Sequence, residues 1–169
     1  MKTVLDITGK SQYEKDIDER FRPSACGPVT AHVILRYHFP HHMHAVNELY
    51  RLLGSTKIGL FTWRFIRNMK KLLGEAWIVE KCSVNEVIHE IDNGRPVAAK
   101  FDKWFTLRWR GKFAFDYHWV PVVGYEKNGN ELLLIVHDNG GRNRTSQLRT
   151  ISYKKNKSIL TFVKIKRSH

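Results

Sequence analysis

The sequence predicts an α+β fold, in which an N-terminal helical half packs on a C-terminal antiparallel β-sheet. Four segments before residue 95 carry apolar residues at helical spacing, and a glycine closes three of them. After residue 95, short apolar runs rich in β-branched and aromatic residues replace this pattern. The pair Asn128-Gly129 joins two of these runs and indicates a β-hairpin, so we expect the two runs to be adjacent antiparallel strands.

The expected helices cover residues 27–38, 45–54, 59–74 and 83–94. In the second segment, the spacing places Val46, Leu49, Leu52 and Leu53 on one helical face. In the fourth, Ser83 and Glu86 have the spacing of a capping box, in which the two residues satisfy free backbone N–H groups at a helix start. These patterns place the helical part of the fold ahead of the sheet along the chain.

The expected strands cover residues 95–102, 118–126, 131–138, 148–153 and 159–165. Between the first two lies the aromatic and basic segment "KWFTLRWRGKFAFDY", residues 103–117. Two interpretations of this segment stay open: a pair of short strands, or a loop that covers a groove.

Length and composition indicate one globular domain over residues 1–169, with 42% hydrophobic residues. Two cysteines, outside any CxxC pair, do not form a disulfide framework or a thiolate zinc site. The N-terminus lacks the apolar core of a signal peptide, and no apolar run has the length of a membrane span. The chain as given is therefore predicted to be cytoplasmic, or extracellular if an export signal has been removed from it.

The formal net charge is +13, and it is concentrated late in the chain, because no acidic residue follows Asp138. The basic residues after it are Arg142, Arg144, Arg149, Lys154, Lys155, Lys157, Lys164, Lys166 and Arg167. Since no known nucleic-acid motif accompanies the charge, this basic C-terminal segment is interpreted first as a solvated face that keeps the protein soluble. The alternative is that it meets an anionic partner, such as nucleic acid, a lipid surface or an acidic peptide.

The stretch "RPSACGPVTAHVILRYH", residues 22–38, places Cys26 at the first turn of an expected helix. Free N–H groups and the helix dipole lower the pKa of a thiol at that position and so favour the nucleophilic thiolate. Pro28 fits the first turn, and Gly27 permits close approach of another group. The alternative is a buried cysteine that only packs. Cys82 lacks such surroundings and is assigned a structural role.

A nucleophilic cysteine needs a base, and the base needs a group that orients it. His118 begins one strand of the expected hairpin, and Asp138 ends the other. In an antiparallel hairpin the start of one strand lies beside the end of its partner. The hairpin therefore predicts that His118 and Asp138 are neighbours. Taken singly, each has a plainer interpretation, as an interface histidine and a turn-forming aspartate.

Together, "ACGPVTAHVIL", "GRPVAAKF" and "HWVPVVGYEKNGNELLLIVHDNGG", preceded by Gln12, resemble the C39-like peptidases of the papain-like cysteine protease superfamily. The resemblance extends from Gln12 to the last strand. It implies a papain-like fold with Cys26 as nucleophile, His118 as general base and acid, and Asp138 as the orienting acid. It also implies that the Gln12 side-chain amide and the Cys26 backbone N–H form an oxyanion hole.

The resemblance has one departure at the site: Asn139 follows Asp138 where the family usually has proline. Asn139 is therefore an alternative orienting residue. The expected activity is that of a thiol hydrolase or acyltransferase on a peptide or other acyl bond, with no cofactor. Because such families include inactive members, the alternative is a papain-like module that binds an anionic polymer or acidic peptide through its basic face. Aromatic residues Trp104, Phe105 and Trp109 would support such binding.

A histidine-rich tract, "HFPHHMH", holds His38, His41, His42 and His44. Pro40 interrupts it, and no thiol or acidic partner lies nearby in sequence, so we expect a loop and no metal site.

Overall fold

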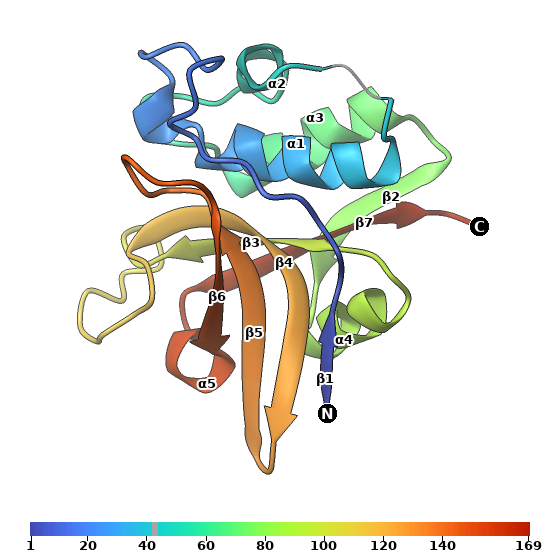
Figure 1. Cartoon of the computed structure of the whole chain (residues 1–169), viewed down its shortest axis with the longest axis vertical. Coiled ribbons are helices and arrows are strands. Elements are labelled where there is room, and N and C mark those ends of the chain that lie inside the picture. Colours follow the sequence, from blue (N-terminus) through green and yellow to red (C-terminus); the bar gives the residue numbers. More distant parts are fainter. Residues whose placement is uncertain (42–43) are drawn as a thin grey trace.

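The computed structural model describes residues 1–41 and 44–169. Helices α1 (Cys26–His38), α2 (Val46–Leu52) and α3 (Thr62–Leu73) form a layer on one side of a β-sheet (Figure 1). Helix α4 (Val84–Asp92) packs on the opposite side. A short 3-10 helix, η1 (Arg22–Ser24), precedes α1, and the short helix α5 (Tyr153–Asn156) follows the sixth strand. The α+β prediction, with helices packed on an antiparallel sheet, is confirmed.

The strands are β1 (Lys2–Val4), β2 (Trp77–Cys82), β3 (Val97–Asp102), β4 (Tyr117–Asn128), β5 (Glu131–Asp138), β6 (Gln147–Ser152) and β7 (Leu160–Arg167). They form one antiparallel sheet in the order β2-β7-β3-β4-β5-β6, and β1 also pairs with β4. The hairpin between β4 and β5 pairs Asn128 with Glu131, so the expected turn is present.

Strands β1 and β2 were not predicted from the sequence. Strand β1 has three residues, too few to show an alternating pattern. Strand β2, "WIVEKC", lies between α3 and α4, so the chain enters the sheet before its helical half is complete. Its alternation is weak, because Val79 is its one fully buried residue.

Strand β3 is buried on both faces and separates two cores. Ala98 contributes to the core beneath α1 and α3, whereas Val97 and Phe101 contribute to the core beneath α4. Successive strand residues point to opposite faces, so Lys100, two residues after Ala98, faces the α1 and α3 layer.

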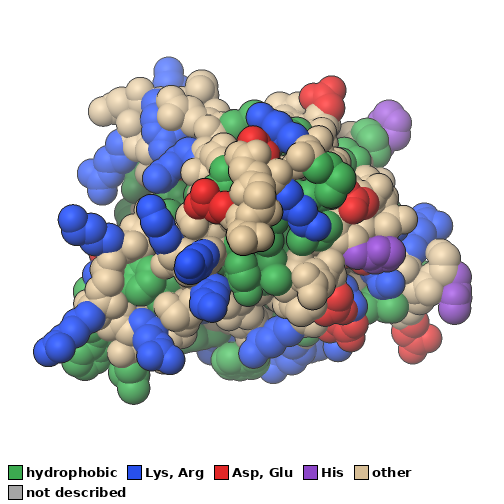
Figure 2. Space-filling model, turned by 90° about the horizontal axis from the view of Figure 1, so that it is seen from below, with side chains coloured by type: hydrophobic (Ala, Val, Ile, Leu, Met, Phe, Trp, Pro, Cys, Tyr) green, Lys and Arg blue, Asp and Glu red, His purple; other side chains and the backbone are tan. Residues whose placement is uncertain are grey.

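The segment left open by the sequence, residues 103–116, is a loop (Figure 1, yellow). Its two ends are tied by a hydrogen bond from the Lys103 backbone N–H to the Asp116 carbonyl, and Asn156 accepts a hydrogen bond from the Ala114 N–H. Lys and Arg side chains are densest on the side of the molecule that carries this loop, at the left of Figure 2.

Strand β4 is long enough to pair with two strands, β3 and β1, along one edge. Tyr117 to Val122 pair with β3, and Gly124 to Glu126 pair with β1, with an irregularity in the β5 pairing between these two stretches. The start of β4 lies against α1, and this contact brings His118 to the N-terminal end of that helix.

Among the described residues, no helix combines the length and the apolar character that a membrane span requires.

Candidate active site

Cys26 is the first residue of α1, and only Ala25 separates it from η1. No side chain caps the helix start, so its free N–H groups point toward the thiol end of the helix. Gly27 is required by the packing: a Cβ there would lie 2.8 Å from Leu60 Cδ2. The thiol itself is 5% exposed, which shields its charge from bulk water.

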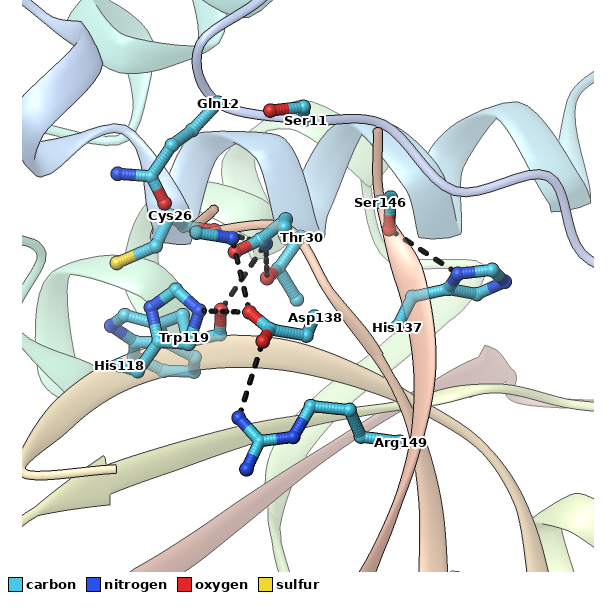
Figure 3. Close-up of polar contacts among 12 residues, drawn as sticks. Ser11, Gln12, Cys26, Thr30, His118, Trp119, His137, Asp138, Ser146 and Arg149 are labelled. Atoms are coloured by element: carbon cyan, nitrogen blue, oxygen red, sulfur yellow. Dashed lines mark hydrogen bonds and ion pairs between the residues drawn. The ribbon is translucent and has the colours of Figure 1, made fainter. Parts of the chain in front are cut away.

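His118, the second residue of β4, faces Cys26 across the boundary between the helical layer and the sheet (Figure 3). The imidazole lies close enough to the thiol for each group to shift the pKa of the other. The Phe115 ring packs against the imidazole at a centroid distance of 4.8 Å. This packing fixes the plane of the ring beside the thiol.

Asp138, the last residue of β5, lies on the other side of the imidazole. Its Oδ1 is 3.3 Å from His118 Nε2 and accepts a hydrogen bond from the Gly140 N–H at 3.1 Å. The His118 contact is an ion pair and not a well-aligned hydrogen bond, because Nε2 has no acceptor at suitable geometry. Since Nε2 faces Asp138, Nδ1 is the ring nitrogen left for the thiol.

Two arginines hold the second oxygen of Asp138. Arg144 Nη2 donates to Oδ2 at 2.7 Å and Arg149 Nη1 donates at 3.2 Å. Both arginines belong to the basic C-terminal segment, and the expectations from the sequence assigned neither of them to the site. The structure adds this role, because both contact Asp138. One signal was available: β6 pairs with β5, and Arg149 lies two residues after Gln147, the register partner of Asp138. Residues two apart share a strand face.

The electrostatics of the three side chains favour a charged pair. Burial alone raises the pKa of the Cys26 thiol, but the contact with His118 outweighs it and the pKa is lowered overall. Burial likewise lowers the pKa of His118, but Asp138 and Cys26 outweigh it and raise that pKa to about 9. Burial raises the pKa of Asp138, yet His118, the Gly140 N–H and Arg149 hold it well below its usual value. The two opposed shifts favour a thiolate–imidazolium pair over a neutral thiol and imidazole.

Asn139, the alternative orienting residue, is directed elsewhere. Its Nδ2 donates to the Trp119 carbonyl at 3.2 Å, and to the Cys26 carbonyl and Thr30 Oγ1 at 3.4 Å each (Figure 3). Asn139 thus joins α1 to β4 from within the core. Of the two adjacent residues, Asp138 is the one in contact with the His118 ring.

Gln12 reaches the same place from the N-terminal segment. Its side chain is buried, and its backbone N–H donates to the Asn139 carbonyl at 2.9 Å. Nε2 donates one hydrogen bond to the Arg22 carbonyl at 2.7 Å, and Oε1 has no hydrogen-bond partner among the described residues. The second N–H of Nε2 remains for another acceptor.

A cleft of about 180 Å³ opens over the thiol, with Gln12, Cys26, His118 and Gly140 among its lining residues. Larger grooves flank it. One, of about 470 Å³, is lined in part by Tyr13, Pro23 and Arg142, and the other, of about 510 Å³, by Phe115 and Asp138. Each groove borders the cleft, since Pro23 also lines the cleft in the first case and His118 in the second.

The histidine-rich tract takes no part in this cleft. His38 ends α1, and His44 pairs with Glu48 at 2.9 Å, while His42 lies outside the described residues. Across residues 1–41 and 44–169, no cluster of side chains has the composition and spacing of a metal site.

A cysteine at the start of a helix, packed against an antiparallel sheet that carries a histidine, defines the papain-like fold. The Peptidase_C39 like family model matches residues 4–168, so the chain belongs to this family. No curated protein matches the sequence.

Solved structures agree with this assignment at low sequence identity. A crystal structure assigned as a C39-like peptidase of Bacillus anthracis is similar over 100% of both chains, with a TM-score of 0.70 and 13% identity. The peptidase domain of Streptococcus ComA, a bifunctional ABC transporter of a quorum-sensing pathway, has a TM-score of 0.55 and 16% identity, over 88% of this chain and 93% of that one. These likenesses establish the fold.

Proposed function

We propose that the chain is a thiol hydrolase that cleaves a peptide or other acyl bond through Cys26, His118 and Asp138. The observation that carries the proposal is the convergence of these side chains from three distant segments, with the imidazole between the thiol and the carboxylate. Membership of a peptidase family supports the same conclusion. A structural role alone would not require the opposed pKa shifts of the thiol and the imidazole.

The geometry suggests the order of proton transfers. The Cys26 thiolate attacks the carbonyl carbon, and the carbonyl electron pair moves to its oxygen. The His118 imidazolium then donates its proton to the leaving amine, which departs as the acyl–thioester forms. His118 then takes a proton from a water molecule, whose oxygen attacks the thioester carbonyl; the C–S bond breaks, the acid is released, and the thiolate–imidazolium pair is restored.

The negative carbonyl oxygen formed in each step needs donors. In this proposal the first donor is the backbone N–H of Cys26, at the start of α1, where no side chain caps the helix. The second donor is the N–H of Gln12 Nε2 that is not bound to the Arg22 carbonyl. A donor of this kind contributes about 3–4 kcal/mol to transition-state stabilisation. In the resting state Nε2 is held by the Arg22 carbonyl, so Gln12 can donate its remaining N–H without losing that anchor.

The same acyl–enzyme could transfer its acyl group to an amine instead of water. The outcome depends on which nucleophile enters the cleft. Product analysis separates the two: hydrolysis releases a free acid, and transfer yields a new amide.

The proposal is tested by incubating the protein with a mixed peptide library and sequencing the new termini by mass spectrometry. We expect new termini with the wild-type chain and with Cys82→Ala, and none with Cys26→Ala. Equal cleavage by Cys26→Ala would contradict the proposal. If no cleavage or transfer occurs although Cys26 is alkylated readily, the chain is a binding module.

One observation supports that second candidate. Trp104, Phe105 and Trp109, in the 103–116 loop, are 51%, 60% and 65% exposed. Exposed aromatic rings among basic residues bind anionic polymers by stacking and charge.

A further inference from the structure

Apart from the catalytic cleft and the two grooves beside it, a cavity of about 590 Å³ lies between α3, strands β2 and β3, and the 103–116 loop. We call it the Lys100 pocket. Its walls combine aromatic rings with four cations and one carboxylate. The cations are Arg67, Lys70, Lys81 and Lys100, and the carboxylate is Asp102.

Lys100 is the unusual member, because it is 5% exposed in a strand that is buried on both faces. A buried ammonium is costly unless its donors are used. Its one carboxylate neighbour, Asp102, is 3.5 Å away, longer than a charge-assisted hydrogen bond. The rings of Tyr117, Trp119 and Phe61 surround Nζ at 5.0, 5.6 and 5.9 Å. Cation–π contacts help to hold the charge in place, and beyond the ion pair with Asp102 the ammonium has N–H donors left for a ligand.

The other three cations of the pocket, unlike Lys100, have no acidic partner among the described residues. Among the described residues, Arg67, Lys70 and Lys81 form no ion pair. Lys164 shows the contrast. It follows directly after Val163, the register partner of Lys81, and it is bound by two glutamates, Glu80 and Glu86. The Lys100 pocket therefore holds an excess of positive charge that an anion could neutralise.

The Lys100 pocket is separated from the catalytic cleft by a single ring. Tyr117 lines the cleft on one side and contacts Lys100 on the other. Phe105, which lines the Lys100 pocket, meets Tyr117 edge-on at 6.4 Å. Although burial lowers the pKa of Lys100, the charges of Asp102 and Cys26 act in the opposite direction, so the two sites are electrostatically linked. One extended ligand could occupy both.

We propose that the Lys100 pocket binds an acidic side chain of the peptide substrate, next to an apolar residue that packs on the Phe61, Trp63 and Phe105 rings. The inference rests on the proposed function, because it names the substrate class of that site. Free ammonium and guanidinium donors recognise a carboxylate, and the aromatic walls recognise its apolar neighbour.

Binding is measured on Cys26→Ala, which cannot turn the ligand over, by fluorescence anisotropy. The probes are a labelled peptide with glutamates flanked by leucines and the same peptide with glutamines. We expect the glutamate peptide to bind at least about tenfold more tightly, the effect of one charge-assisted hydrogen bond, and to weaken as salt is added. Equal affinity for the two peptides would overturn the proposal.

Matched variants locate the site. Lys70→Gln/Lys81→Gln removes two cations from the Lys100 pocket, and Lys154→Gln/Lys155→Gln removes two cations from α5. We expect the first pair to abolish the preference for glutamate and the second to leave it. Equal losses would show that net charge is responsible, and a larger loss from the α5 pair would move the anion site to the basic C-terminal segment; either result overturns the proposal.

Lys100→Met keeps the volume of the buried side chain and should also abolish the preference, with folding checked by circular dichroism. If this variant does not fold, the Lys70 and Lys81 variants still decide the question. Glutamate-selective binding without cleavage by the wild-type chain would contradict the proposed function alone. Cleavage that does not distinguish the two peptides would contradict this inference alone.

Discussion

Arg144 binds the one oxygen of Asp138 that does not face His118: Arg144 Nη2 lies 2.7 Å from Oδ2, while Oδ1 faces the imidazole. Arg149 supports the same oxygen and packs its guanidinium over the Phe115 ring at 4.7 Å. The carboxylate is thus held from behind by positive charge. The arginines fix its orientation, and they also weaken its pull on the His118 proton.

The first prediction follows from this opposition. Arg144→Ala should raise the pKa of His118 further above about 9, because a cation that disfavours the imidazolium is removed. The alkaline limb of the turnover profile, which reports loss of the His118 proton, should therefore move to higher pH. Maximum turnover should fall a few-fold, since Asp138 is less firmly oriented. Rates measured from about pH 6 to about pH 11, on either side of the His118 pKa, give the position of the alkaline limb and the maximum turnover.

Arg142→Ala is the matched control for this experiment. Arg142 lies in the same loop but stacks over Tyr13 at 5.4 Å. Its removal should leave the alkaline limb in place. If both variants move the limb equally, general charge is responsible and the specific contact with Asp138 is not.

The second prediction separates Asp138 from Asn139. Asp138→Ala removes the carboxylate that stabilises the imidazolium, so the pKa of Cys26 should rise and alkylation by iodoacetamide should require higher pH. Asn139→Ala should leave the pH dependence of alkylation unchanged. It should instead lower thermal stability by about 1–3 kcal/mol, because buried carbonyls lose their donor. An alkylation profile that moves with Asn139→Ala and stays with Asp138→Ala would assign the orienting role to Asn139.

The third prediction concerns the two thiols. Burial and the nearby Glu86 raise the pKa of Cys82 to about 12, whereas that of Cys26 is lowered. Limited iodoacetamide at neutral pH should therefore label Cys26 first, as mapped by mass spectrometry. In Cys26→Ser, labelling should nearly disappear. Preferential modification of Cys82 in the wild-type chain would contradict the assignment of the nucleophile.

The fourth prediction tests how tightly His118 is placed. A Cβ at position 140 would lie 2.8 Å from His118 Cε1 and 2.9 Å from Nε2, closer than van der Waals contact. Gly140→Ala should push the ring from its position between Cys26 and Asp138. A misplacement of this kind costs about a hundredfold in rate, with little change in melting temperature. Gly129→Ala, in the distant hairpin turn with no atom near its Cβ, should leave the rate unchanged. Full activity in Gly140→Ala would show that His118 is not constrained there.

Local patterns were sufficient for much of the fold. The capping box of Ser83 and Glu86 forms as expected, and α4 begins immediately after it. The hairpin signal was equally informative, because β4 and β5 pair from the turn as far as Val122 and Val136, and just beyond this pairing His118 contacts Asp138. These features depend on contacts between residues that are near each other in sequence.

Features that depend on distant contacts could not be read in this way. The sequence of loop 103–116 is rich in β-forming aromatic residues, yet it forms no strand. Both edges of β3, the strand that precedes this loop, are already occupied, one by β4 and the other by β7. The same limit applies to the site. No local pattern places Arg144 against Asp138 or buries Lys100 among three aromatic rings, since both depend on which elements become neighbours.

The sheet order has a consequence for synthesis of the protein on the ribosome. Strand β2 lies at the edge of the sheet, and its neighbour is β7, which the ribosome delivers about eighty residues later. Strand β7 also completes one side of β3, which in turn supports β4 and His118. Cys26 is therefore synthesised long before the part of the sheet that supports His118 is complete. Pairing over such separations is slow, so a competent nucleophile would arise late, after translation has passed residues 160–167.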